Sequence, residues 1–147
     1  MARSRWLSVG LLYWAFGCGN EPSDASPTGA WRFDAVYEGA GTACTVTAST
    51  LTLSVTAGQW NGSISGGNAG CEGLPGEAPV LANPPDVALD SIRVYGDSIA
   101  FVLVGGKTDL RGVITPGHMN GVMDVFAPLC TECTGPLLVG TWTAARP

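Results

Sequence analysis

Apolar and polar residues alternate with a period of two along most of the chain after residue 29. Such alternation is typical of strands that bury one face. In the first segment, residues 31–38, the apolar set is Trp31, Phe33, Ala35 and Tyr37. The same pattern predicts further strands at 51–55, 60–65, 92–94, 99–103, 110–114, 119–125 and 137–145. No segment shows a helical apolar stripe, so we expect an all-β domain of eight strands, with nine as the alternative.

Turn residues and two irregular stretches separate these strands. Hairpin turns are predicted at Gly96-Asp97, Gly105-Gly106 and Thr115-Pro116-Gly117-His118. The apolar phase switches between Val46 and Leu51, which predicts a bulge or a short turn at residues 48–50. Residues 66–85 are rich in glycine and proline and longer than a hairpin connection. We expect a long loop there, which is a lid, a binding loop or a simple excursion; under the ligand-binding hypothesis it would form a rim or lid.

Consecutive antiparallel hairpins with one apolar face form either an up-and-down β-barrel or a β-sandwich. The expected domain begins with Gly29-x-Trp31 and ends with Gly140-Thr141-Trp142. The first element resembles the motif that opens the first strand of lipocalins, and the second is similar to strands of avidin-like barrels. The resemblance implies a lipocalin-like barrel of about eight strands, whose first and last strands pair. It also implies a basic residue, Arg146 or Arg111, over the Trp31 ring.

The N-terminal segment has a different character. Two arginines lie within the first five residues, and residues 6–16 are apolar apart from Ser8. This stretch is shorter than the ~20 helical residues needed to cross a bilayer. The small residues Ala15 and Gly17 lie three and one positions before Cys18. A positive start, a short apolar core and small residues at the end indicate a secretory signal peptide.

Gly17 and Cys18 resemble the cleavage motif of bacterial lipoproteins, in which the first mature cysteine receives a lipid on its sulfur. The resemblance implies a signal peptide over residues 1–17, a lipidated Cys18 and anchoring in the bacterial cell envelope, at the outer membrane. Residues 18–28 contain no large apolar side chain and read as a flexible tether. Residues 29–147 then form the barrel domain. Ordinary signal cleavage, giving a secreted or periplasmic protein, is the alternative.

The chain has five cysteines, an odd number for an exported protein. If Cys18 carries lipid, the four that remain, Cys44, Cys71, Cys130 and Cys133, can pair completely. We expect structural disulfides, with one between Cys44 and Cys71 and a tight local one between Cys130 and Cys133. A zinc site of four sulfurs and a redox-active Cys-x-x-Cys are the alternatives.

Charge and side-chain chemistry exclude several functions. Five basic and twelve acidic residues follow Cys18, a formal net charge of −7. A surface of this sign repels phosphate backbones, so we expect no nucleic-acid partner. His118 is the only histidine, and no Gly-x-Ser-x-Gly nucleophile motif is present. We therefore expect neither an enzyme nor a metal or other cofactor.

Two functions fit these observations. The first is a structural or interaction role for a membrane-anchored lipoprotein with a protein partner in the envelope. The alternative is a binding module that holds a small hydrophobic ligand inside the barrel. The residues expected to line such a site are Trp31, Phe33, Trp60, Phe101, Met119, Met123 and Trp142. The same residues would otherwise form a filled core, because an eight-stranded barrel has room only for side chains or one small ligand.

Overall fold

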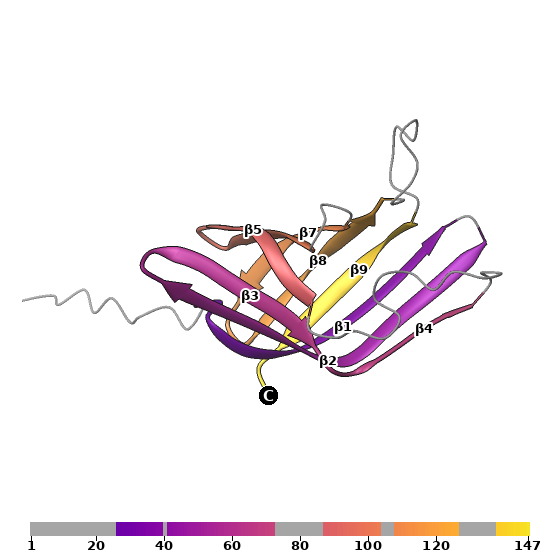
Figure 1. Cartoon of the computed structure of the whole chain (residues 1–147), viewed down its shortest axis with the longest axis horizontal. Helices are drawn as coiled ribbons and strands as arrows, with labels where there is room; N and C mark the ends of the chain where they lie inside the picture. Colours follow the sequence, from indigo (N-terminus) through magenta and orange to yellow (C-terminus); the bar gives the residue numbers. More distant parts are fainter. Residues whose placement is uncertain (1–25, 40, 73–86, 104–107, 127–137) are drawn as a thin grey trace, which may run out of the picture.

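A computed structural model describes residues 26–39, 41–72, 87–103, 108–126 and 138–147. These residues form strands without a helix (Figure 1). The strands are β1 Gly29–Gly39, β2 Thr42–Thr56, β3 Gln59–Ser65, β4 Asn68–Glu72, β5 Val87–Tyr95, β6 Ser98–Leu103, β7 Thr108–Thr115, β8 His118–Val125 and β9 Leu138–Ala145. The all-β prediction is confirmed.

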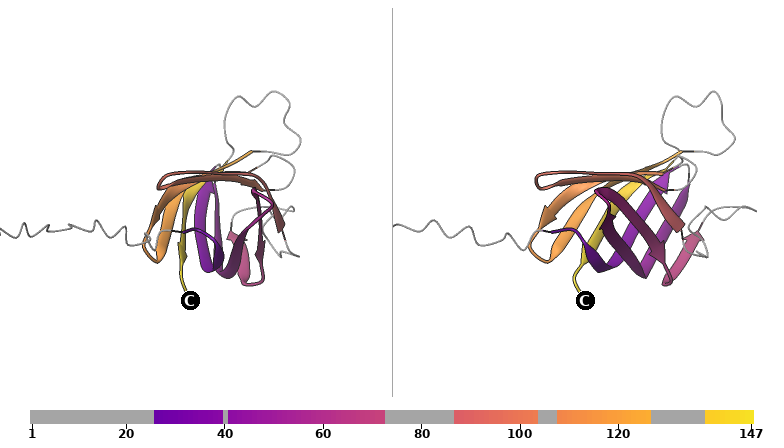
Figure 2. Two further views of the ribbon diagram at one scale, coloured as in Figure 1. Left: turned by 90° about the vertical axis from the view of Figure 1, so that its left-hand side faces the viewer. Right: turned by 60° about the vertical axis from the view of Figure 1, so that its left-hand side comes forward.

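All strand pairings are antiparallel, and the sheet closes on itself. Its order is β1-β9-β8-β7-β6-β5-β3-β2, and β2 pairs again with β1. The first and last strands lie side by side, with Ala35 opposite Trp142 (Figures 1 and 2). The structure is thus a closed barrel of eight strands with β4 as an extra strand, as expected for a lipocalin-like barrel. The β-sandwich is not formed.

Part of the predicted long loop is a strand instead. β4 pairs with the first half of β2, from Ala43 opposite Glu72 to Thr47 opposite Asn68. β3 pairs with the second half of the same edge of β2. The two short strands therefore follow one another along β2, with Gly66 and Gly67 between them at positive φ. The glycines that favoured a loop form the bend between two paired segments. Residues 73–86 lie outside the described residues.

The other irregularities confirm the sequence reading. Ala48 has a φ of 56°, and the register between β1 and β2 shifts at this point, so the predicted bulge is present. The carboxylate of Asp34 accepts a hydrogen bond from the Ala48 backbone N–H at 2.8 Å, which holds the bulge in place. The hairpin turns at Gly96-Asp97 and Pro116-Gly117 are also present. The predicted turn at Gly105-Gly106 lies outside the described residues.

The inward apolar side chains of the strands pack together and fill the interior of the barrel. Its buried hydrophobic residues are Trp31, Phe33, Ala35, Tyr37, Cys44, Val46, Leu51, Leu53, Ile64, Leu89, Ile99, Phe101, Leu103, Leu110, Ile114, Met119, Met123, Leu138, Trp142 and Ala144. Burial raises the pKa of the Tyr37 phenol to about 12, so this ring enters the core as a neutral group. Val55 has the same phase as the inward Leu51 and Leu53, which predicts burial, but it is 46% exposed. Its part of the β2–β3 hairpin lacks a neighbour in β5, which pairs with β3 only at Ser63 and Ile64.

Residues 26–31 and Arg146, near the two limits of the described chain, meet at one end of the barrel. The guanidinium of Arg146 lies 4.1 Å from the centre of the Trp31 ring, and it donates a hydrogen bond to the Ser26 carbonyl at 2.8 Å. The Trp31 indole N–H donates to the Pro27 carbonyl at 2.8 Å. Gly29, with a φ of 112°, leaves the space that the guanidinium fills. The expected cation over Trp31 is confirmed, and Arg146 is the residue that supplies it.

We predict that Arg146→Ala lowers the free energy of unfolding by about 1 kcal/mol, because the cation–π contact and a charged hydrogen bond are both lost. Urea unfolding followed by far-UV circular dichroism measures the change. Arg32→Ala is the matched control: Arg32 forms an exposed ion pair with Asp34 at 3.4 Å, and its loss should change stability little. Equal effects of the two substitutions would contradict a stabilising role for Arg146.

Candidate functional site

The residues expected to line a ligand site pack against one another. Trp31, Phe33, Phe101, Met119, Met123 and Trp142 are at most 1% exposed, and Trp60 is half-buried. The Trp142 ring lies 6.0 Å from the Phe33 ring and meets the edge of Phe101 at 5.4 Å, measured between ring centres. The structure thus gathers six of the seven inside the barrel, where they form its core.

The predicted cysteine sites are only partly described. Cys44 and Cys71 are joined by a disulfide that links β2 to β4, so both lie in strands rather than in loops. Cys18, Cys130 and Cys133 lie outside the described residues. Within the described ranges no group of His, Cys, Asp and Glu is arranged to hold a metal ion. His118 begins β8 on the exposed side, where its carbonyl accepts a hydrogen bond from the Thr115 hydroxyl.

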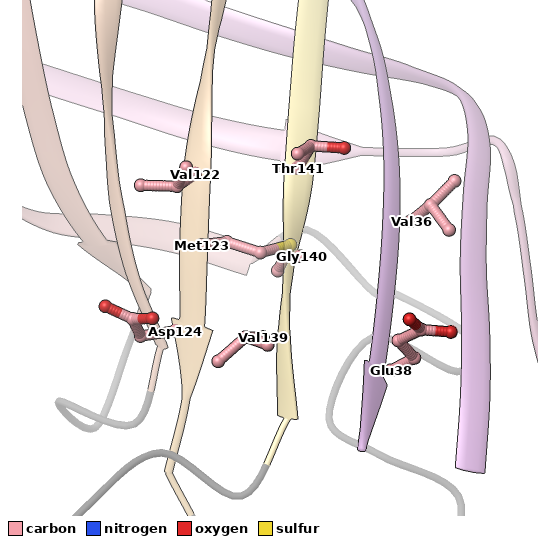
Figure 3. Close-up of a pocket in the computed structure, with 8 residues that line it drawn as sticks. All are labelled: Val36, Glu38, Val122, Met123, Asp124, Val139, Gly140 and Thr141. Atoms are coloured by element: carbon pink, nitrogen blue, oxygen red, sulfur yellow. The ribbon is translucent and has the colours of Figure 1, made fainter.

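A groove on the outer wall crosses β1, β9 and β8. It encloses about 570 Å³ and is open to solvent. Figure 3 shows the side chains that line it in two tiers. The upper tier contains Val36, Thr141 and Val122, and the lower tier contains Glu38, Val139 and Asp124. The main chain of Gly140 and of Met123 lies between them.

The floor of the groove is main chain, with Gly140 of β9 at its centre. Gly140 occupies an inward position of β9, between Leu138 and Trp142, and its neighbours across the sheet are Tyr37 and Met123. A Cβ at this position would overlap the carbonyl oxygen of Val36. The backbones of β1 and β9 therefore approach each other closely here. The outward side chains of the two tiers stand on either side of this floor.

The walls of the groove are apolar and exposed. Val36, Val122 and Val139 are 55%, 48% and 49% exposed, respectively, although they are aliphatic. Two further depressions share residues with this groove. One includes Glu38, Val139 and Glu72, and the other includes Val122 and Thr141 beside Gly121. The hollowed surface therefore extends along the wall from β4 to β7.

Acidic side chains follow one register row of this wall. Glu72 lies opposite Ala43, Ala43 opposite Glu38, Glu38 opposite Val139, and Val139 opposite Asp124. Asp124 forms an ion pair with Arg111 of β7. Glu38 and Glu72 form no ion pair with any residue in the described ranges. The groove thus combines an exposed apolar surface with an excess of negative charge.

Sequence reasoning missed this groove because it sought a ligand site among the inward residues. The available signal is that valine recurs in the outward phase, at positions 36, 122 and 139, where polar residues are expected. Glycine recurs in the inward phase, at positions 121 and 140. These departures from simple alternation can be recognised as neighbours only when the pairing of β1, β9 and β8 is known.

Comparisons of this chain with protein-family models, with curated proteins and with solved structures give no match. In the parts of the chain that the structure describes, no helix is long and apolar enough to cross a membrane. Functional inference for this protein therefore rests on its own residues and their arrangement.

Proposed function

We propose that this protein is a lipid-anchored interaction module of the bacterial cell envelope. Cys18 carries the lipid, the residues that follow it space the domain from the membrane, and the outer wall of the barrel presents a docking surface. The observation that carries the interaction role is the contrast between a barrel interior filled by aromatic and aliphatic side chains and an outer wall hollowed along β1, β9 and β8.

The position of the groove suits a tethered domain. The tether joins β1 at Gly29, whereas Glu38 lies nine residues further along the same strand. An extended strand rises about 3.3 Å per residue, so the lower tier of the groove is about 30 Å from the tether. Ser26 and Pro27, which the sequence placed in the tether, are held against the barrel by Arg146 and Trp31. This contact fastens the part of the tether nearest the domain to the barrel.

A ligand inside the barrel is the less favoured function. The Trp142 indole lies against Phe33, Phe101 and the inward Gly112 of β7. A ligand would have to displace these side chains, and displacing well-packed core groups is costly. The depressions described above open on the outer wall instead.

We predict that the full chain, expressed in a bacterial host with radiolabelled palmitate, acquires label and sediments with the membranes. Cys18→Ala should abolish the label, since no other residue in the motif offers a sulfur to the transferase. The same variant should lose membrane association, because the lipid on Cys18 is the proposed anchor. Gel autoradiography after membrane fractionation measures both effects.

Cys133→Ala is the matched control for this experiment, because it removes a cysteine outside the leader motif and should keep the label. Label that persists in the Cys18→Ala chain would contradict the lipid anchor. An unlabelled wild-type chain found in the soluble fraction would favour ordinary signal cleavage.

A further inference from the structure

We propose that the outer-wall groove binds an extended protein segment in which Lys or Arg alternates with aliphatic residues. This inference names the partner class of the interaction role proposed above and rests on it. The groove, as defined by its two tiers, consists of Val36, Thr141 and Val122 above and Glu38, Val139 and Asp124 below.

The upper, apolar tier indicates that the partner carries aliphatic side chains. Val36 and Val122 flank Thr141 in a row that crosses three strands, and both valines are about half exposed. Covering apolar surface of this kind is favourable at roughly 25 cal/mol per Å². Exposed aliphatic residues that gather around a hollow are typical of interaction sites, in contrast to single scattered ones. The partner therefore presents aliphatic side chains to this tier.

The lower, acidic tier indicates that the partner carries positive charge. Glu38 and Asp124 lie two strands apart, about 10 Å at the usual strand spacing, with Val139 between them. Only Arg111 offsets these carboxylates in the described part of the chain, and Glu72 adds another negative charge at the adjoining depression. The whole chain after Cys18 is also acidic. A cationic partner is thus attracted to the groove, and a second copy of this chain is repelled.

The two tiers also determine the pattern of the partner. They are separated by two residues along each strand, about 7 Å. An extended segment that lies along the groove turns successive side chains to opposite sides, one set toward each tier. Basic and aliphatic residues in alternation therefore satisfy both tiers at once. Long basic side chains reach carboxylates at uneven spacing because their stems are flexible.

The test uses the full chain purified from membranes in mild detergent and three synthetic peptides of equal length. One alternates Lys and Val, one alternates Glu and Val, and one alternates Lys and Ser. We expect measurable binding of the Lys–Val peptide by isothermal titration calorimetry. Binding of the other two should be at least about tenfold weaker, because each lacks one of the two contributions. Added salt should weaken the Lys–Val complex as screening increases.

Substitutions in the outer-wall groove test whether the peptide binds there. Val36→Ser combined with Val139→Ser should weaken Lys–Val binding about tenfold, and Glu38→Gln about threefold. The matched controls are Val55→Ser, whose valine is 46% exposed at the β2–β3 hairpin, and Asp97→Asn in the β5–β6 turn. Both controls should bind as wild type. Circular dichroism verifies that every variant is folded.

Several outcomes would overturn the proposal. Equal binding of the Glu–Val peptide would remove the charge argument, and unchanged affinity in the Val36/Val139 variant would place any binding elsewhere. A wild-type dimer in analytical ultracentrifugation that this variant dissociates would assign the groove to a second copy. Repeating the titration with the Cys18→Ala chain separates the two proposals, because peptide binding does not require the lipid.

Discussion

Trp142→Ala is expected to lower the free energy of unfolding by about 3–5 kcal/mol, as do comparable truncations of large buried aromatic residues. Trp142 is 1% exposed, and its ring contacts Phe33 and Phe101. Its indole N–H donates a hydrogen bond to the Val122 carbonyl at 3.1 Å, and the substitution leaves that acceptor without this partner. A small domain has a total stability of only about 5–15 kcal/mol.

The neighbours of Trp142 cannot close the resulting cavity. A Cβ on Gly112 would lie 2.6 Å from Cζ2 of the indole, and a Cβ on Gly121 would overlap the Arg111 carbonyl oxygen. The ring therefore lies against Gly112, which faces Gly121 across the sheet, and neither glycine has a side chain to fill the place of the ring. The cost of a large-to-small substitution increases with the cavity that remains. We therefore expect Trp142→Ala to lower the free energy of unfolding by an amount near the upper limit of the range, about 5 kcal/mol.

Thermal and urea unfolding followed by circular dichroism measures this effect. The melting temperature should fall by roughly 10–20 °C for a domain of this size. Trp60→Ala is the matched control, because Trp60 is half-buried at the β2–β3 hairpin and should have a clearly smaller effect. A loss below about 1 kcal/mol in Trp142→Ala would contradict the packed-core description.

Replacing both Cys44 and Cys71 with alanine is expected to lower the free energy of unfolding by about 3 kcal/mol. The disulfide joins residues 27 positions apart, and the chain-entropy model assigns about this stabilisation to a closed loop of such a length. The two cysteines lie directly opposite each other on β2 and β4, and Cys44 is fully buried. The bond thereby fastens β4, the shortest strand, to the barrel.

Reduction provides an independent measurement of the same quantity. Dithiothreitol should lower the urea midpoint of the wild-type protein to that of the double variant and leave the double variant almost unchanged. Cys130→Ala with Cys133→Ala is the comparison, because a bridge across two intervening residues closes a much shorter loop and should contribute less. An unchanged midpoint on reduction, or four reactive thiols in the exported protein, would contradict the disulfide.

The acidic residues of this protein illustrate how chain-level charge and surface charge differ. From the sequence, the excess of acidic residues predicts that nucleic acid is not a partner, but it indicates no partner of its own. In the folded chain, register brings Glu72, Glu38 and Asp124 into one row, although they are far apart in the sequence. The row lies beside exposed valines, and this combination supports a cationic, aliphatic partner.

The sequence by itself determined the fold class and much of the core. Alternation with a period of two assigned Trp31, Phe33 and Phe101 to the buried face, because a strand turns every second side chain the same way. The phase switch before Leu51 located the bulge. The glycine and tryptophan at both ends predicted that β1 and β9 would meet. These features are local or depend on a periodic pattern, so they can be read without knowing which strands are neighbours.

Only the tertiary structure decided the features that depend on neighbours across the sheet. β4 forms because Asn68–Glu72 finds a partner edge on β2, a gain that no local propensity of this glycine-rich stretch reveals. The glycines at 112, 121 and 140 matter because of the backbones and the indole that approach them. The groove arises where outward valines from three strands meet above one of these glycines. Register between distant segments sets which side chains become neighbours, and register is fixed when the barrel closes.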